Sequence, residues 1–222
     1  MKTLTKYLNE KLVIFPSQVD EKLVIFPSQV DEKLVINKDY NDPYTCVPTS
    51  WEELRKIIED RYDKLGPGTK QKPIDFNDVD VSNIDSFYTD INNINLEIFG
   101  IFEATKFKYI DISDWDVSKV KDTGRMFYGC IQLKSVGDLS DWDVSKVKEM
   151  SSMFYDCINL KSVGDLSNWN VSNVKNMCYT FGGCEQLKSV GDISNWDVSN
   201  VEYMFDAFKK SGITNIQKWY RG

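Results

Sequence analysis

Three cysteines recur at one fixed spacing, and thiolates held in register are ligands for soft metal ions. Cys130, Cys157 and Cys184 lie 27 residues apart. If 27-residue units stack as neighbouring strands, about 4.8 Å apart, these thiols come within reach of one ion. Each cysteine also follows a phenylalanine by three residues, and a free cysteine in apolar surroundings packs as a small hydrophobic residue. We expect a cysteine ladder in the core, with no metal and no cofactor.

Four tryptophans share this spacing and raise the same choice between binding and packing. Exposed in register, they would form an aromatic platform for a ligand. Their fixed period and apolar neighbours favour a ladder inside the core. The four residues are Trp115, Trp142, Trp169 and Trp196.

A row of lysines and serines also repeats, beside positions that we expect to face inward. If Leu133 and Val136 point into the core, the two residues between them point outward. This row is the expected ligand-facing surface, although a solvated face explains it equally well. It consists of Lys134, Ser135, Lys161, Ser162, Lys188 and Ser189.

Acidic residues gather before each tryptophan and after it, a composition that can bind calcium. Asp138, Asp141 and Asp143 have an acidic counterpart in the next unit only at Asp165, and the spacing does not match an EF-hand loop. Asp and Asn also close turns through their own side chains. We expect turn formation and solubility from them, and no metal site.

Composition excludes several function classes. The chain has 222 residues and no histidine, which rules out catalytic triads and His-ligated zinc. Its net charge of −7 disfavours nucleic acid as a partner. There is no Gly-rich phosphate loop, no nucleophile-elbow motif, no apolar run of membrane-spanning length and no secretory signal. We expect a cytoplasmic protein that is not an enzyme and does not insert into membranes.

The unit that carries these residues runs from Leu133 to Asn159 and predicts a strand, a turn and a short helix. Gly137 indicates a tight bend in the strand. Ser145 is a candidate N-cap, and the apolar stripe that leads to Phe154 has helical spacing. One such unit cannot bury its apolar face alone, so stacked units must bury it against each other. The predicted fold is an α/β repeat, a β/α solenoid of 27-residue units.

The flanks of the solenoid predict a capping helix and a short β-rich N-terminal segment. Ser50 and Glu53 form a capping box, and Gly66 ends the helix. EKLVIFPSQVD occupies Glu10–Asp20 and recurs at Glu21–Asp31, so an 11-residue strand is duplicated in tandem. It is either a tolerant tether or a strand-adding segment. The predicted boundaries are a leader at 1–41, a linker at 42–49, a capping helix and connection at 50–76 and a solenoid at 77–222, the last comprising a degenerate unit at 77–110, regular units at 111–208 and a C-terminal cap at 209–222.

The repeat resembles the BspA-type leucine-rich repeats of the DUF285, or bacterial surface protein, family. The motif DLSxWDVSxVxxMxxMFxxCxxL carries the resemblance and stands at Asp111–Leu133, Asp138–Leu160 and Asp165–Leu187. The resemblance implies a leucine-rich-repeat-like solenoid with a curved sheet and a binding or adhesive role without catalysis. It does not fix a ligand.

The first ten residues, MKTLTKYLNE, resemble the capsid-targeting peptides of tailed-phage internal head proteins. That resemblance implies processing after Glu10 and a place in a phage virion. Our main prediction is a non-catalytic binding or structural module that presents a surface to a protein or glycan and is tethered or targeted by its N-terminal segment. The alternative is a phage virion-associated protein, packaged or decorating, recruited through residues 1–41.

Overall fold

The structure is a computed structural model that describes residues 47–87, 101–102, 106–214 and 219–220. The tandem strands of residues 1–41, the processing site at Glu10 and most of the predicted linker lie outside the described residues.

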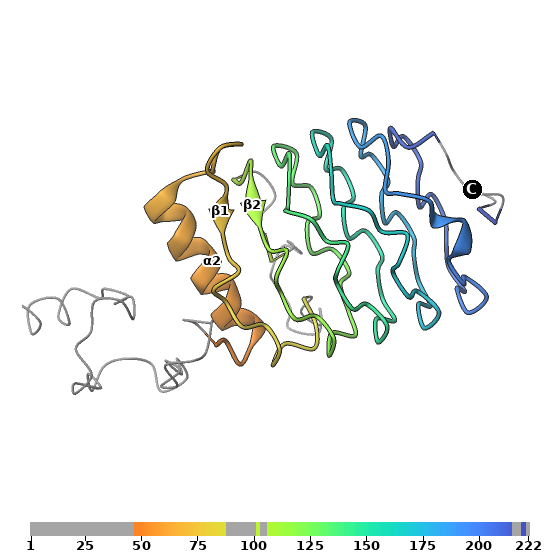
Figure 1. The fold of residues 1–222 in the computed structure, drawn as a ribbon, viewed down its shortest axis with the longest axis horizontal. Helices are drawn as coiled ribbons and strands as arrows, with labels where there is room; N and C mark the ends of the chain where they lie inside the picture. Colours follow the sequence, from red (N-terminus) through yellow and green to blue (C-terminus); the bar gives the residue numbers. More distant parts are fainter. Residues whose placement is uncertain (1–46, 88–100, 103–105, 215–218, 221–222) are drawn as a thin grey trace, which may run out of the picture.

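Helix α2 (Trp51–Leu65) lies across one end of the molecule (Figure 1). The hydroxyl of Ser50 accepts the N–H of Glu53 at its start, and Gly66 ends it with a φ of 73°. The Glu53 carboxylate accepts the N–H of Thr49, one residue before the position that the capping box predicts. Leu54 is buried with its neighbours against the first coil. No helix among the described residues is long and apolar enough to cross a membrane.

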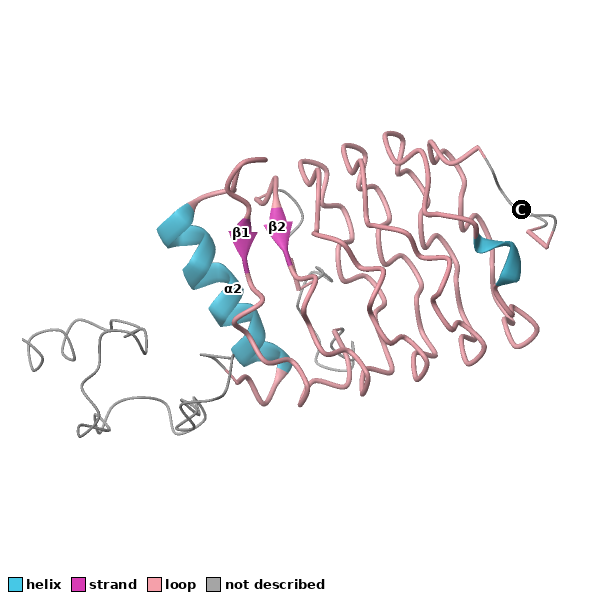
Figure 2. Ribbon diagram, in the orientation of Figure 1, coloured by secondary structure: helices cyan, strands magenta, loops and turns pink. Residues whose placement is uncertain are grey.

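Beyond α2 the chain winds in coils that lie side by side (Figure 1), each regular coil being one 27-residue unit. Strands β1 (Ile74–Asp75) and β2 (Ile110–Asp111) pair in parallel and join the first two coils. Later coils are joined by single parallel bridges, so Figure 2 draws them as loops and turns. One ladder of bridges passes through Tyr109, Ser135 and Ser162, and a second passes through Ser86, Asp122, Glu149, Asn176 and Tyr203.

The short helix predicted to begin at the N-cap Ser145 and to run to Phe154 is not present, and turns take its place. Ser152 and Asp156 each have a φ of 57°, which no right-handed helix accommodates. The N–H of Ser152 donates to the carbonyl oxygen of Cys178 at 2.8 Å, and the N–H of Phe154 donates to Thr180 at 2.9 Å. Alternate N–H groups therefore bond to the next coil. Besides α2, the described residues contain only the three-residue 3-10 helix η2 (Ile193–Asn195).

Aromatic ladders fill the core between the coils. The rings of Phe127 and Phe154 stack with centroids 5.1 Å apart, and Phe181 continues the stack at 5.6 Å. The tryptophan rings stack in the same direction, 6.5 Å apart from Trp142 to Trp169. Because each ring contacts its copy in the next coil, packing on one coil depends on its neighbours.

Trp219 adds one more ring to the tryptophan ladder. It stacks on Trp196 at 6.3 Å, and its indole N–H donates to the carbonyl oxygen of Ile193 at 3.2 Å. The sequence predicts a C-terminal cap at 209–222, of which residues 215–218 and 221–222 lie outside the described residues. Trp219 thus packs against the last coil at the end of the tryptophan ladder.

Candidate functional site

The cysteine ladder is part of the core. The thiol of Cys157 donates to the carbonyl oxygen of Phe127 at 3.1 Å, and that of Cys184 donates to Phe154 at 3.0 Å. Burial raises the pKa of Cys184 to about 12 and raises that of Cys157 as well. Both thiols stay protonated at neutral pH, which does not suit metal binding. The part of the chain that the structure describes holds no cluster of His, Cys, Asp and Glu fit for a metal ion.

The four repeated tryptophans are buried, so they present no exposed platform. The indole N–H of Trp142 donates to the carbonyl oxygen of Ile112 at 3.2 Å, and that of Trp169 donates to Leu139 at 2.8 Å. Each indole thus satisfies a polar group inside the core while its ring stacks along the ladder.

The predicted lysine and serine row lies in register on the outside of the first ladder of bridges. Its serine hydroxyls are used locally: that of Ser162 accepts the N–H of Gly164 at 3.3 Å, and the other two act alike. The ammonium of Lys134 lies 5.7 Å from the ring centre of Tyr109, and that of Lys188 donates to its own coil. The structure places these six residues on one side of the molecule, and the three serine hydroxyls accept hydrogen bonds within turns.

The repeated aspartates close turns. Asp138 accepts the N–H of Ser140, and Asp143 accepts the N–H of Ser145, both at 3.0 Å. Hydrogen bonds from the hydroxyl and the N–H of Ser145 lower the pKa of Asp143. These contacts match the turn role that the sequence predicts for the acidic residues.

An aromatic stripe on the surface was not predicted. It consists of Tyr128, Tyr155, Tyr179 and Phe205, four rings from successive coils. Tyr128 stacks on Tyr155 at 5.4 Å, and Tyr179 touches Tyr155 and Phe205 edge-on at 5.3 and 5.5 Å. Tyr128 is 36% exposed and Phe205 is 60% exposed. One feature of the sequence indicates the stripe. Tyr128 and Tyr155 each follow a core phenylalanine, so their side chains must face outward.

Exposed apolar residues and charged groups both occur near the residues of the stripe. Ile131 and Ile158 are exposed large hydrophobic residues that follow Tyr128 and Tyr155 by three residues. The ammonium of Lys209 lies 5.6 Å from the ring centre of Phe205. The same ammonium pairs with the carboxylate of Asp206 at 2.6 Å, and the charge of Asp156 is the main cause of a raised pKa at Tyr155.

A pair of carboxylates lies on the second ladder of bridges. Asp122 and Glu149 are bridge partners, and Asn176 takes the same position in the next coil. Burial, followed by the charge of Glu149, raises the pKa of Asp122 to about 6. Asp122 accepts the N–H of Gly124 at 2.8 Å, and the Asn176 amide donates to Glu149 at 3.2 Å.

Asp122→Asn is expected to stabilise the protein at pH 7.5 by about 1 kcal/mol, after discounting for solvent screening of this half-buried group. The folded pKa of about 6 exceeds the ordinary value of 3.8, so the folded state holds this proton more tightly. The stability that Asp122 contributes is therefore present below pH 3.8 and is lost as the pH rises through 6. Urea unfolding at pH 4 and at pH 7.5 measures the change.

Asp143→Asn is the control for that prediction, because Asn170 occurs naturally at its equivalent position. The pKa of Asp143 is lowered, so its substitution should reduce stability at pH 7.5, with the opposite sign. A loss of stability in Asp122→Asn at pH 7.5 would contradict the assignment of a raised pKa.

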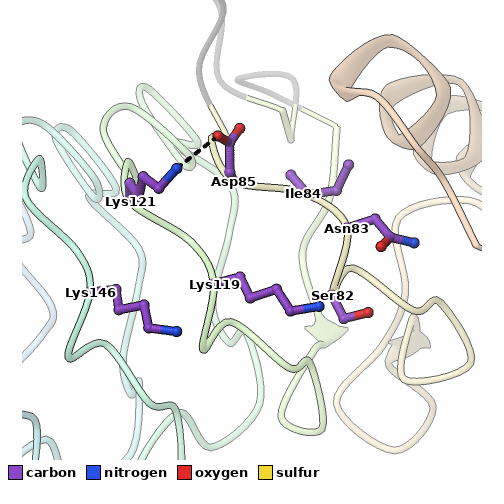
Figure 3. A pocket seen from close by; sticks show the side chains of 7 residues that line it. All are labelled: Ser82, Asn83, Ile84, Asp85, Lys119, Lys121 and Lys146. Carbon is purple, nitrogen blue, oxygen red and sulfur yellow. Dashed lines mark hydrogen bonds and ion pairs between the residues drawn. The ribbon is translucent and has the colours of Figure 1, made fainter.

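A hollow of about 360 Å³ opens where the degenerate first coil meets the regular ones (Figure 3). The ammonium of Lys121 pairs with the carboxylate of Asp85 at 3.4 Å. The side chains of Lys119 and Lys146 point in the same direction from neighbouring coils in Figure 3. The lining residues are Ser82, Asn83, Ile84, Asp85, Lys119, Lys121 and Lys146.

Comparison with known proteins identifies a family. A family model described as Mycoplasma protein of unknown function, DUF285, matches residues 73–163 and 96–219. No curated protein and no solved structure matches the chain. The matched region contains every regular coil, the aromatic stripe and the lining of the hollow. Because the two matches span residues 73–219, well over half of the chain, the protein belongs to the DUF285 family.

Proposed function

We propose that this protein is a non-catalytic binding module, a leucine-rich-repeat-like solenoid that recognises a protein partner through the aromatic stripe. The parallel bridges between coils, with their 27-residue register, support the solenoid. The coils are rigid because aromatic ladders pack between them, and a rigid scaffold lets surface side chains bind with little loss of entropy.

The observation that carries the proposal is the contact among four aromatic rings at the surface, of which Tyr128 and Phe205 are exposed and Tyr155 and Tyr179 are half-buried. Tyrosine supplies a large contact area at low conformational cost, and aromatic residues dominate the energetics of protein interfaces. Tyr128 and Tyr155 are already stacked, so they need no ordering on binding. The faces of Tyr128 and Tyr155 are partly used by stacking on each other, and sugar rings pack best on open aromatic faces. This geometry favours a protein over a glycan.

The absence of catalysis is part of the proposal and rests on how the reactive groups are used. The carboxylates of Asp138 and Asp143 close turns, and buried Cys157 keeps its proton. No histidine is present to move protons near neutral pH. The chemistry of these side chains supports folding instead of turnover.

Replacing Tyr155 and Tyr179 together by serine is expected to weaken partner binding at least 30-fold. Truncating one interface hot spot costs about 2 kcal/mol, which is a factor of about 30 in affinity. Immobilised wild-type protein and the double variant are incubated with lysate of the source cells, and retained proteins are identified. A glycan array is probed in parallel.

The double variant Lys161→Ala/Lys188→Ala is the comparison, since it removes the same number of side chains from the lysine and serine row. We expect the same protein on wild type and on this variant, and its loss on the tyrosine variant. Thermal melting checks that each variant is folded. Retention by the tyrosine variant, loss on the lysine variant, or glycan binding without a protein would each overturn the proposal.

A further inference from the structure

The hollow beside the first coil breaks the repeat symmetry. Asn83 and Asp85 stand where the next coil has Lys119 and Lys121, an offset of 36 residues. The following coil keeps lysine at both positions, Lys146 and Lys148, whereas the first coil has the shorter side chains. The hollow lies at this junction and is lined by lysines of the regular coils and by residues 82–85 of the first coil (Figure 3).

The lining carries uncompensated positive charge. It contains three lysines against one aspartate, and that aspartate already pairs with Lys121. Among the described residues, the ammoniums of Lys119 and Lys146 have no ion pair or hydrogen bond. The nearest acidic side chains that they influence, Asp116 and Asp143, are held mainly by their own serines and do not line the hollow.

The two free lysines occupy equivalent positions in adjacent coils, 27 residues apart. Both side chains line the hollow, each coming from its own coil (Figure 3). A group with two negative charges would match the two ammoniums, and the hydroxyl of Ser82 is a further hydrogen-bond donor in the lining.

We propose that this hollow binds a dianionic tetrahedral oxyanion, the phosphate or sulfate group of a ligand, between Lys119 and Lys146. A singly charged carboxylate leaves one of the two ammoniums uncompensated. The hollow lies apart from the aromatic stripe, so this site stands whether or not the stripe binds a protein.

The test is a titration of the full chain with sodium sulfate and with methyl phosphate, at constant ionic strength kept with NaCl. Backbone amide shifts of Ser82, Asn83, Lys119 and Lys146 are followed by NMR. We expect saturable shifts at these residues. Phosphate monoesters gain their second charge near pH 6, so methyl phosphate should bind more tightly at pH 7.5 than at pH 5. Sulfate affinity should not change over this range.

Lys119→Ala and Lys146→Ala are each expected to weaken binding at least tenfold, as loss of a charge-assisted hydrogen bond does. Lys148→Ala is the matched control, because it removes the same charge two residues away and outside the hollow. Saturation by only one of the two anions would identify the ligand group. Shifts that do not saturate, equal weakening in Lys148→Ala, or acetate binding as tightly as sulfate would overturn the proposal.

Discussion

Trp142→Ala is expected to lower the free energy of unfolding by about 3–5 kcal/mol, the cost of truncating a large buried aromatic side chain. Trp142 is only 4% exposed and stacks on Trp169 with an interplanar angle of 4°. Its removal leaves a cavity between two coils, and neither coil can close the gap without breaking its register with the next one. Urea unfolding followed by circular dichroism measures the loss.

Two further variants separate the contributions to this loss. Trp142→Phe keeps most of the apolar area and removes the indole N–H. It should therefore lower the free energy of unfolding by about 1–2 kcal/mol less than Trp142→Ala does. Tyr203→Ala, at a side chain that is 61% exposed, should change stability by less than about 0.5 kcal/mol. An unchanged unfolding curve for Trp142→Ala would show that the tryptophan ladder does not hold the coils together.

Gly164→Ala is expected to destabilise the protein by about 2 kcal/mol or more, because two costs act at one position. Gly164 has a φ of 89°, which L side chains rarely adopt. A Cβ there would also collide with the carboxylate of Asp138, which closes the turn at the start of the preceding coil. Thermal and urea unfolding both report the change.

Gly66→Ala is the matched control, since Gly66 also has a positive φ but open space around its Cβ position. It should cost only the conformational penalty, about 1–3 kcal/mol for a φ of 73° with a ψ of −157°. Adding Asp138→Ala to Gly164→Ala should recover part of the loss, because the collision disappears while the strained φ remains. Equal destabilisation by the two glycine variants would mean that close packing between coils contributes nothing at Gly164.

The sequence predicted which residues are buried better than it predicted their backbone. Val147, Met150, Cys157, Leu160 and Val163 are all buried. Their steps of three and seven residues match the spacing of a helix face. The chain instead turns every few residues, so inward positions recur at about three residues without any helix. A turn-rich coil and an amphipathic helix therefore give nearly the same apolar pattern.

Residues in the left-handed conformation distinguish the turn-rich coil from a helix, and their residue types do not predict this conformation. Arg125, Ser152, Tyr179 and Asp206 share one position in successive coils, each with a φ between 53° and 58°. Glycine would have revealed this conformation, but four other residue types occupy the position. Bonding to the next coil holds them there, which is a tertiary effect that a single unit does not contain.

The surface was harder to predict than the core for a related reason. A search for identity at 27 residues finds the cysteines and tryptophans, since core positions keep their residue type. The stripe moves from Tyr155 to Tyr179 and on to Phe205, which are not equivalent positions. It becomes continuous only when the coils are stacked, so the repeat pattern conceals it.

Hydroxyl-radical footprinting tests the central claim, binding through the aromatic stripe, most directly. Side-chain labelling is measured on the protein alone and with the partner that it retains from lysate. We predict that labelling falls at Tyr128, Tyr155, Tyr179 and Phe205 and is unchanged at Tyr109, beside the lysine and serine row. Unchanged labelling along the stripe, with protection beside that row instead, would contradict the account.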